Sequence, residues 1–412
     1  MEFIADFHIH SKYSRATSKD MDIAHIAEWA KLKGMTLMGT GDFTHHLWLE
    51  ECKASLEDLG NGLFKYKDIY FILTSEISSI YSKKGKGYRI HNMVFSPSFK
   101  TTDKINETLS RYGNLASDGR PILGMDAQEI ARIIFDIDEN CMIVPGHIWT
   151  PWFSLFGSMS GFNRIEDCFE DQAPKIFALE TGLSSDPAMN WRLSALDRFT
   201  LISNSDSHSP SKIGREANVF DCELNYQAIR EVLKTKDRKK FLYTIEFFPE
   251  EGKYHFDGHR LCGVRLSPAQ TKENKGKCPK CGRAVTVGVM NRVEQLADRP
   301  QGYKPANSIP FKNLIPLDEI IAEVKGMTKA SQAVGKEYRS CLAKFGTEFE
   351  ILMKAPREEL MRGLSPGLAE GVLKVRAGQV DIQAGFDGEY GKISIFREEE
   401  KKDREEKQLN LF

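Results

Sequence analysis

Short apolar runs alternate with amphipathic segments over the first 240 residues of the chain. The runs are rich in Ile, Leu, Val, Phe and Tyr, which is typical of buried β-strands, and the segments between them have helical spacing. The runs span residues 2–6, 37–41, 70–74, 92–95, 142–145, 176–180 and 200–203. Repeated βα units of this kind predict an α/β barrel, whose strand ends and following loops form the active site.

The pattern changes near residue 245. Residues 245–305 are rich in Cys, Gly, Pro, Lys and Arg, and the segment is too short to build a core unaided. Helical spacing returns between about 317 and 379, with breaks at Gly and Pro, and mixed charges fill the end of the chain. We therefore predict a barrel (1–240), a small module (245–305), a helical domain (306–396) and a charged tail (397–412).

Composition is that of a soluble globular protein. The chain has 412 residues, 41% hydrophobic and 28% charged, and a net charge of −1, so the whole molecule does not signal nucleic-acid binding. No apolar stretch reaches the roughly 18 residues of a membrane span, and the first residues lack a signal-peptide pattern. We expect a cytoplasmic protein with no membrane partner, in which the eight cysteines form no disulfide framework.

Metal-compatible side chains stand at the ends of several apolar runs. The first run closes with His8-Ile-His10, and the two-residue period of a strand puts both imidazoles on one face. The same residue types recur at the edges or ends of later runs, at Glu76, His91, His147, Asp206 and His208. A lone His-x-His is weak, but separate structural explanations would be needed for each residue, so together they predict a metal site.

A second metal site is indicated in the small module. Cys278-Pro-Lys-Cys281-Gly is a zinc-knuckle turn, and His259-Arg-Leu-Cys262 precedes it by fifteen residues. These four side chains predict one structural zinc. His255 is an alternative to His259, and a redox Cys-x-x-Cys is the alternative to zinc.

Two further features suggest contact with DNA. Residues 251–305 carry eleven Lys and Arg against five Asp and Glu, a local surplus that favours a phosphate-backbone surface, although ordinary surface charge would also explain it. The segment after His147 is aromatic, and Trp149 or Trp152 would be placed to stack a flipped base. Burial in the core is the alternative, and we expect it for most of the four rings.

The N-terminal constellation resembles the polymerase and histidinol phosphatase (PHP) superfamily. The resemblance rests on the opening His-x-His, a Gly-Asp turn near residue 40, a single Glu, two isolated His and a late Asp-x-His. It implies a distorted (β/α)7 barrel of the α/β class, followed here by the zinc-binding module and the α-helical domain. The family commonly has an Asp-His pair of ligands where this chain has Asp42-Phe43. Asp42 and His45 are therefore candidate substitutes for that pair.

The resemblance also implies how the ligands divide. His8, His10, Glu76 and Asp206 would hold one metal, and Glu76 would bridge to a second held with His91 and His147. His208 would face a third position. Two or three clustered divalent metals suit phosphate-ester hydrolysis by an activated water, and mixed His and carboxylate ligands favour Zn or Mn, with Mg as an exchangeable alternative.

The order of parts resembles the endonuclease Q family over nearly the full length. The barrel, the Cys/His module and a helical region with LSPGL at 364–368 and GFDGEYGKI at 385–393 carry this likeness. It implies hydrolysis of DNA on the 5′ side of deaminated bases (uracil, hypoxanthine, xanthine) and abasic sites, in repair at the nucleoid. A hydrogen-bond donor would then read the deaminated base, and Arg89 is a speculative candidate.

The last five residues resemble the peptide by which bacterial repair proteins bind the sliding clamp, through Gln408, Leu409, Leu411 and Phe412. A member of the family from a bacterium, recruited to DNA by the clamp, is therefore the leading interpretation. The alternative is a PHP-type phosphatase of a small phosphorylated metabolite, which would have little use for a clamp peptide or a basic zinc module. A DNA-binding scaffold with a decayed barrel is a third reading, which the retained ligand set disfavours.

Overall fold

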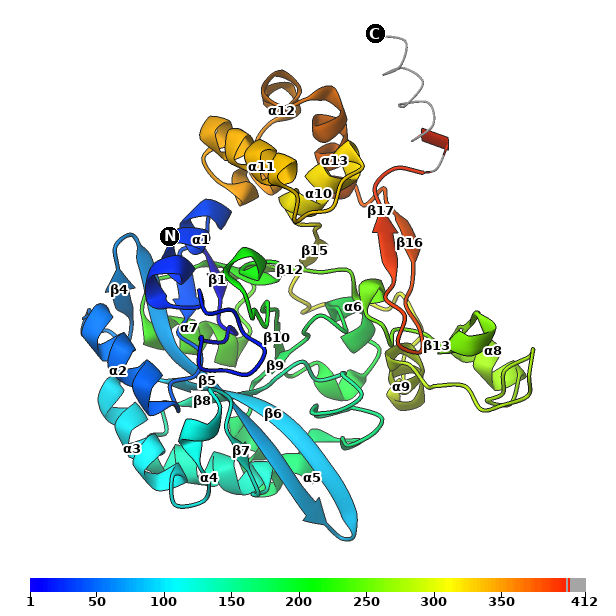
Figure 1. The fold of residues 1–412 in the computed structure, drawn as a ribbon. Helices are drawn as coiled ribbons and strands as arrows, with labels where there is room; N and C mark the ends of the chain where they lie inside the picture. Colours follow the sequence, from blue (N-terminus) through cyan, green and yellow to red (C-terminus); the bar gives the residue numbers. More distant parts are fainter. Residues whose placement is uncertain (398, 401–412) are drawn as a thin grey trace.

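The strands of the N-terminal part close into a ring (Figure 1) in the computed structural model, which describes residues 1–397 and 399–400. The ring contains β1 (Glu2–Asp6), β2 (Leu37–Gly39), β5 (Ile69–Lys83), β6 (Lys86–Ser96), β8 (Met142–Pro145), β9 (Ala178–Glu180), β10 (Thr200–Ile202) and β11 (Ala217–Asp221). Each predicted run overlaps one of the first seven strands, although some runs extend one or two residues beyond the strand. The α/β barrel is therefore confirmed.

The barrel is distorted in the direction and pairing of its strands. β1, β2 and β5 run parallel, whereas β6 is antiparallel to both β5 and β8, and β11 is antiparallel to β1. β9 and β10 pair with each other. A bond from the Ile148 N–H to the carbonyl of Glu180 joins them to β8, and the Asn218 side chain bonds both backbone groups of Ser203 to join them to β11.

Helices cover the outside of the ring. They are α1 (Ile23–Lys33), α2 (His46–Ser55), α3 (Phe99–Leu109), α4 (Ala127–Ile137), α5 (Ile165–Phe169), α6 (Pro187–Asn190) and α7 (Tyr226–Thr235). Side-chain caps begin several of them: Asp22, Ser98 and Asn225 each accept a backbone N–H of the first turn. Their buried apolar faces and the strands enclose the core, so polar residues inside the ring stand out as functional candidates.

The remaining elements form an arm and a cap on the barrel. Short strands β3 (Glu57–Asp58), β4 (Phe64–Tyr66) and β7 (Ile122–Leu123) edge the sheet, and β12 (Phe241–Glu246) and β15 (Phe311–Asn313) extend it beyond β11. The arm contains β13 (Asp257–His259), β14 (Val264–Leu266), α8 (Pro268–Glu273) and α9 (Val289–Leu296). The cap contains α10 (Leu317–Lys325), α11 (Gln332–Phe345), a π-helical turn (Glu350–Lys354), α12 (Arg357–Gly363) and α13 (Pro366–Arg376).

A final hairpin connects the cap back to the arm. β16 (Asp381–Gln383) and β17 (Lys392–Ser394) run from the helices down to β13 (Figure 1). At its tip Phe386 bridges to Phe256, and the Asp387 carboxylate accepts the backbone N–H of Arg260 at 2.6 Å. The arm is thus assembled from two stretches of chain far apart in sequence. Within the described residues, no helix is long and apolar enough to cross a membrane.

A buried ion pair fastens the cap to the barrel. The Nζ of Lys33, at the end of α1, lies 2.7 Å from a carboxylate oxygen of Glu348, and both side chains are 3% exposed. Glu348 also accepts the backbone N–H of Leu317 and the hydroxyl of Tyr338, so three helices meet on one carboxylate. A buried charge costs free energy unless it is paired and hydrogen-bonded, and here it is both.

We expect Lys33→Ala to lower the free energy of unfolding by about 3–5 kcal/mol, because it leaves the Glu348 charge buried without its counter-ion. Lys31→Ala is the matched control: Lys31 pairs with Asp68 at the surface, where both side chains are at least 70% exposed, and its loss should cost less than about 1 kcal/mol. Urea denaturation curves measure both. Equal effects would mean that the buried pair does not hold the cap.

Candidate metal centre

Two loops at the open end of the ring bring the predicted ligands together. The segment after β1 pairs with the segment after β10: the His10 N–H donates to the Ser207 carbonyl and the Ser207 N–H to that of His8. Asp206 therefore lies beside both histidines, with its backbone in the left-handed region at φ 46°. His8 and His10 do share one face, as the strand period predicts, and both ring Nε2 atoms approach Glu76.

Glu76 is the centre of the cluster. Its side chain is fully buried, and its two oxygens face different partners. Oε2 lies 3.6 Å from the Nε2 of His8 and 3.3 Å from that of His10. Oε1 lies 2.7 Å from the Nδ1 of His91 and 3.0 Å from the Nε2 of His147. One carboxylate thus serves two imidazole pairs, which is the geometry of a bridging ligand.

The donor set fits divalent metals. Three groups each place their ligand atoms within 4.8 Å of one another: His8, His10 and Glu76; Glu76, His91 and His147; His10, Asp206 and His208. The Nε2 atoms of His8 and His10 and the Oδ1 atom of Asp206 are buried without a hydrogen-bond partner. Buried polar atoms are rarely left unpaired, and these three point at one another, as atoms that coordinate a cation would.

Electrostatics keep the carboxylates ionised. Burial opposes ionisation of Glu76, but electrostatic interaction with His91, Arg120 and His8 outweighs it and holds the pKa of Glu76 well below the usual range. Burial also opposes ionisation of Asp206, but His10, whose Nε2 lies 3.1 Å from Oδ1, and the charge of His8 lower the pKa of Asp206. Burial lowers the pKa of His91 to about 4, so this imidazole is neutral near pH 7, as a ligand must be.

Buried carboxylates behind the histidines fix their orientation. Glu180, the last residue of β9, contacts the Nδ1 of His8 at 3.0 and 3.1 Å and accepts the backbone N–H of His147 at 2.8 Å. Asp42 contacts the Nδ1 of His10 at 3.0 Å. With Nδ1 occupied, each Nε2 is left to face the cluster, an arrangement common around metal-ligating histidines.

This geometry places the two candidate substitutes, Asp42 and His45, outside the cluster. Both Asp42 oxygens are engaged, one by His10 and the other by the backbone N–H and hydroxyl of Ser11. The His45 ring stacks on Tyr13 with centroids 4.5 Å apart and belongs to none of the three ligand groups. Asp42 contacts a predicted ligand in this structure, and His208 lies with His10 and Asp206 in the third ligand group.

Two residues that contact the cluster, Glu180 and Arg120, were not identified from the sequence. Glu180 ends a predicted strand run, so its place at the open end of the ring was a usable signal. Arg120 lies in a loop with no pattern, and its Nη1 contacts Glu76 Oε2 at 3.1 Å. Only the folded structure brings it to the cluster.

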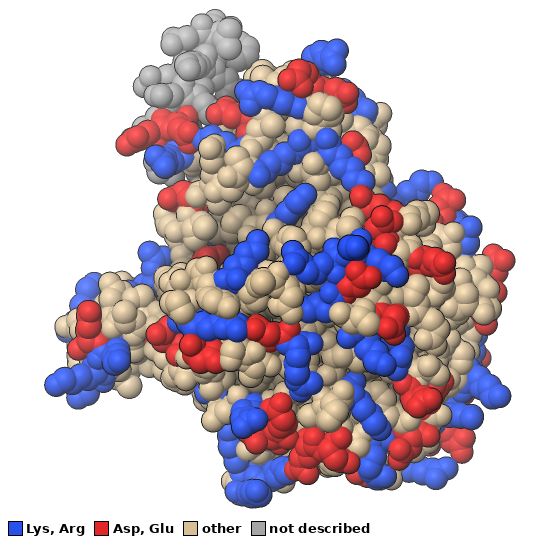
Figure 2. All heavy atoms as spheres, turned by 180° about the vertical axis from the view of Figure 1, so that it is seen from behind, with Lys and Arg blue, Asp and Glu red and all other residues tan. Residues whose placement is uncertain are grey.

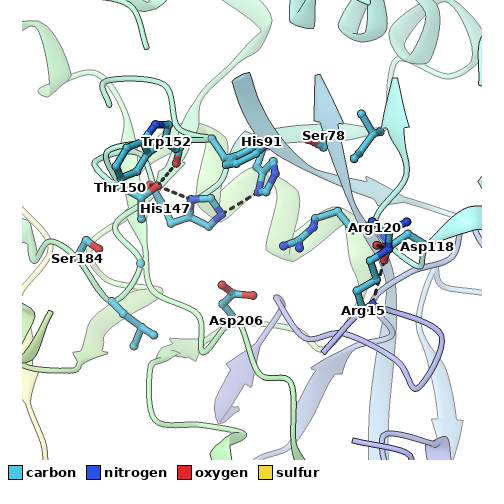
Figure 3. A pocket seen from close by; sticks show the side chains of 14 residues that line it. Arg15, Ser78, His91, Asp118, Arg120, His147, Thr150, Trp152, Ser184 and Asp206 are labelled. Atoms are coloured by element: carbon cyan, nitrogen blue, oxygen red, sulfur yellow. Dashed lines mark hydrogen bonds and ion pairs between the residues drawn. The ribbon is translucent and has the colours of Figure 1, made fainter. Parts of the chain in front are cut away.

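A cavity of about 430 Å³ opens over the cluster (Figure 3). His91, His147 and Asp206 form its floor, Arg120 and Arg15 one side, and Thr150, Trp152 and Ser184 the other. Arg89 is exposed and faces an adjacent hollow that Trp152 also lines, with its guanidinium 5.5 Å from the Phe153 ring. The size suits one nucleotide with its phosphate.

The two tryptophans have different positions. Trp149 is 1% exposed, packs on Phe156 and donates its indole N–H to Asn190, so the prediction that it contacts DNA does not fit this structure. Trp152 is 39% exposed and meets Tyr254 of the arm edge to face, with centroids 6.0 Å apart. Of the pair, only Trp152 presents its ring to the cavity.

The predicted zinc ligands come together in the arm. The ligand atoms of His259, Cys262, Cys278 and Cys281 all lie within 4.8 Å of one another, and the cysteines are free thiols. Gly282, at φ 74°, turns the backbone so that its N–H donates to the Cys278 carbonyl at 2.8 Å. Three thiols and one imidazole at this spacing form a closed set typical of structural zinc. His255 is buried elsewhere and belongs to no ligand group among the described residues.

Comparison with known families adds an independent finding. The family model of the MJ0043 C-terminal domain matches residues 316–379. The uncharacterized protein YqxK of Bacillus subtilis is 30% identical over 409 residues, covering 94% of this chain and 98% of YqxK. MJ0043 of Methanocaldococcus jannaschii, also uncharacterized, is 34% identical over 272 residues; the match covers 63% of this chain but only 33% of that longer protein.

Two solved structures are similar over almost the whole chain. The lesion-specific endonuclease PfuEndoQ from Pyrococcus furiosus superposes with a TM-score of 0.87 at 34% identity, covering 97% of this chain and 96% of that one. Endonuclease Q in complex with a 27-mer duplex substrate, with an abasic lesion at the active site, gives 0.85 at 33% identity, covering 97% and 98%. The likeness extends through the barrel, the arm and the cap.

We expect Glu180→Gln to weaken metal binding about 10–100-fold, because the amide keeps the shape but loses the charge that orients His8. Calorimetric titration of metal-free protein with Mn²⁺ or Zn²⁺ measures this. Glu170→Gln, a change at a half-exposed pair with Lys83, is the matched control and should bind metal normally. Normal metal affinity in Glu180→Gln would contradict a role for Glu180 in the metal centre.

We expect Cys278→Ser to lose one equivalent of zinc and to destabilise the arm, since zinc ligation supplies much of the folding free energy of a module this small. Elemental analysis and limited proteolysis of residues 253–297 report the two effects. Cys341→Ser, a buried cysteine of the cap, should keep its zinc. Unchanged zinc content in Cys278→Ser would contradict the site.

Proposed function

The chain belongs to the endonuclease Q family, and we propose that it is a metal-dependent endonuclease that hydrolyses DNA at lesions. The observation that carries the proposal is the Glu76-centred cluster under a cavity of nucleotide size. Two or three divalent metals held by His8, His10, Glu76, His91, His147, Asp206 and His208 would activate water and neutralise the phosphate. Zn, Mn and Mg all remain candidates.

An abasic site is the lesion with the strongest support, because a relative 33% identical over 97% of this chain was crystallised with one at its active site. An abasic nucleotide lacks the stacking that holds a base in the helix, so it leaves the duplex at little cost. The cavity would receive that nucleotide, and the cluster beneath would hydrolyse the phosphodiester on its 5′ side.

We extend the proposal to the deaminated bases uracil, hypoxanthine and xanthine. Deamination replaces an amino donor by a carbonyl acceptor, so a protein donor accepts the damaged base and opposes the intact one. Arg89 and the hydroxyls of Thr150 and Ser184 are the candidate donors around the cavity, and Trp152 is the ring placed to stack the base. These assignments rest on position alone.

Binding of the duplex is assigned to surfaces around the cavity. On the face shown in Figure 2, Lys and Arg side chains spread over the barrel, the arm and the cap, interspersed with Asp and Glu. This face is of mixed charge, so the support for DNA binding by the arm is the positive surplus of residues 251–305, and we extend the role to the helical part at 306–396. The enzyme would then act in the cytoplasm, at the nucleoid, where its substrate lies.

The proposed clamp-binding peptide, Gln408, Leu409, Leu411 and Phe412, lies outside the described residues. Its support is the sequence pattern at the end of a charged stretch. A pull-down with a bacterial sliding clamp, comparing the full chain with Leu411→Ala, would test it.

Asp206→Asn should abolish DNA cutting, with a loss of about a thousandfold or more, because it removes a ligand charge from the cluster. The assay is a gel of end-labelled duplex with one abasic site, uracil or hypoxanthine, in Mg²⁺, Mn²⁺ or chelator. Asp136→Asn, an exposed change on α4, is the matched control and should cut normally.

A nick directly 5′ of the lesion, lost with chelator and in Asp206→Asn, is the expected result. Turnover of a small phosphate ester without any nick would instead make the protein a metabolite phosphatase of PHP type. Tight binding of lesion DNA without a nick in either metal would instead indicate a DNA-binding scaffold with a decayed barrel.

A further inference from the structure

A second charged constellation lies at the edge of the cavity, outside the metal ligands. Two loops meet there, one after β1 and one before β7, and the Gly119 N–H donates to the Tyr13 carbonyl at 3.2 Å. Any side chain at Gly119 would collide with its neighbours, because a Cβ there would lie 2.2 Å from an Asp42 oxygen and 2.4 Å from the Ser14 hydroxyl. The second loop is therefore pressed directly against the residue that orients His10.

Asp118 ties the two loops together and holds an arginine in each. Its Oδ1 accepts the backbone N–H of Arg15 at 3.2 Å and that of Arg120 at 3.2 Å. Its Oδ2 lies 3.4 Å from the Nε of Arg15, and its own side chain is 9% exposed. A nearly buried carboxylate is thus used to fix two cations side by side at one wall of the cavity.

Arg120 reaches inward from this anchor. Its guanidinium extends into the cavity between His91 and Asp206 (Figure 3), while one nitrogen contacts Glu76 Oε2. The side chain is 27% exposed, although its partner Glu76 is fully buried. The fork of N–H groups therefore lies beside the proposed metal ligands and is still open to a ligand entering the cavity.

Arg15 stands farther out on the same wall. Its side chain is 75% exposed, and Asp118 is the one carboxylate with which it pairs among the described residues. Asp118 keeps its two backbone N–H donors without this 3.4 Å contact, so the exposed guanidinium can exchange Asp118 for another anion. One arginine thus faces the floor of the cavity and the other its mouth.

We propose that Asp118, Arg15 and Arg120 form a phosphate clamp, in which Arg120 binds a non-bridging oxygen of the scissile phosphate and Arg15 binds the neighbouring backbone phosphate. The planar guanidinium matches phosphate with two parallel hydrogen bonds, which a lysine does not. Arg120 is then a catalytic residue that contacts substrate, and Asp118 is a positioning residue. The clamp rests on the proposed function, since it needs a polynucleotide with adjacent phosphates.

The first test separates the two arginines kinetically on an abasic duplex. Arg120→Ala should lower kcat about 10–100-fold, the range for a lost charged hydrogen bond, and Arg120→Lys should lie between it and the unmodified protein. Arg15→Ala should raise KM with kcat unchanged and reduce the salt dependence of DNA binding by about one unit of log–log slope. Arg111→Ala, an exposed arginine on the preceding loop that pairs with Glu107, is the matched control and should change none of these.

Two further measurements distinguish phosphate binding from a merely structural role of these residues. Asp118→Ala should lower kcat about 10-fold, and Asp118→Asn should restore it, because the amide oxygen still accepts both N–H groups. Replacing one backbone phosphate near the lesion by an uncharged methylphosphonate tests Arg15 without changing the protein. At the phosphate that Arg15 contacts, the methylphosphonate should slow cutting by the unmodified protein. It should not slow cutting by Arg15→Ala any further.

The clamp is overturned if Arg120→Lys cuts as fast as the unmodified protein, or if Arg15→Ala keeps the full salt slope and the same sensitivity at every methylphosphonate position. Loss of bound metal in Arg120→Ala with normal cutting by Arg120→Lys would also overturn it, since Arg120 would then only support the centre. Failure of the proposed function gives a different result. The unmodified protein would then leave every lesion duplex intact, and the clamp proposal would also be wrong.

Discussion

The buried charge of Glu76 is the constraint on which the rest of the structure depends. A carboxylate with no solvent contact must be surrounded by cations or donors, or it would take up a proton. The barrel meets this need from several places at once: the segment after β1 supplies His8 and His10, β6 supplies His91, and the loop after β8 supplies His147. The ring has to close before these partners meet, so the fold and the chemistry are stabilised by the same contacts.

The sequence predicted the parts of this site that follow a local rule. Apolar runs located the strands, the two-residue period placed His8 and His10 on one face, and ligands at run ends converged because neighbouring strands end at one edge of the ring. Glu180 and Arg120 were missed because their roles exist only across the ring. Glu180 ends a predicted run, as the ligands do, but it is 172 residues from His8, so the chain does not reveal which imidazole it contacts.

The aromatic segment after His147 shows another limit. It is an irregular loop, with Phe153 at φ 62°, so no helical or strand period tells which ring faces inward. Trp149 and Trp152 are three residues apart, yet one is core and the other lines the cavity. Asp42 was misplaced for a related reason: a Gly-Asp turn near ligands has the right chemistry for coordination, and only its three-dimensional contacts reveal that both oxygens are already occupied.

The hairpin of β16 and β17 has a consequence for how the molecule is made. The arm's four zinc ligands emerge from the ribosome together, but Phe386 and Asp387, which seat the arm, are synthesised about a hundred residues later. Before those residues exist, α9 already joins the arm to the barrel, because Arg292 donates to the backbone carbonyls of Phe156 and Phe162. A chain cut before residue 386 would therefore keep the arm on the barrel through α9 but lose the bridge to Phe256 and the bond to the Arg260 N–H, which fix the outer strand of the arm.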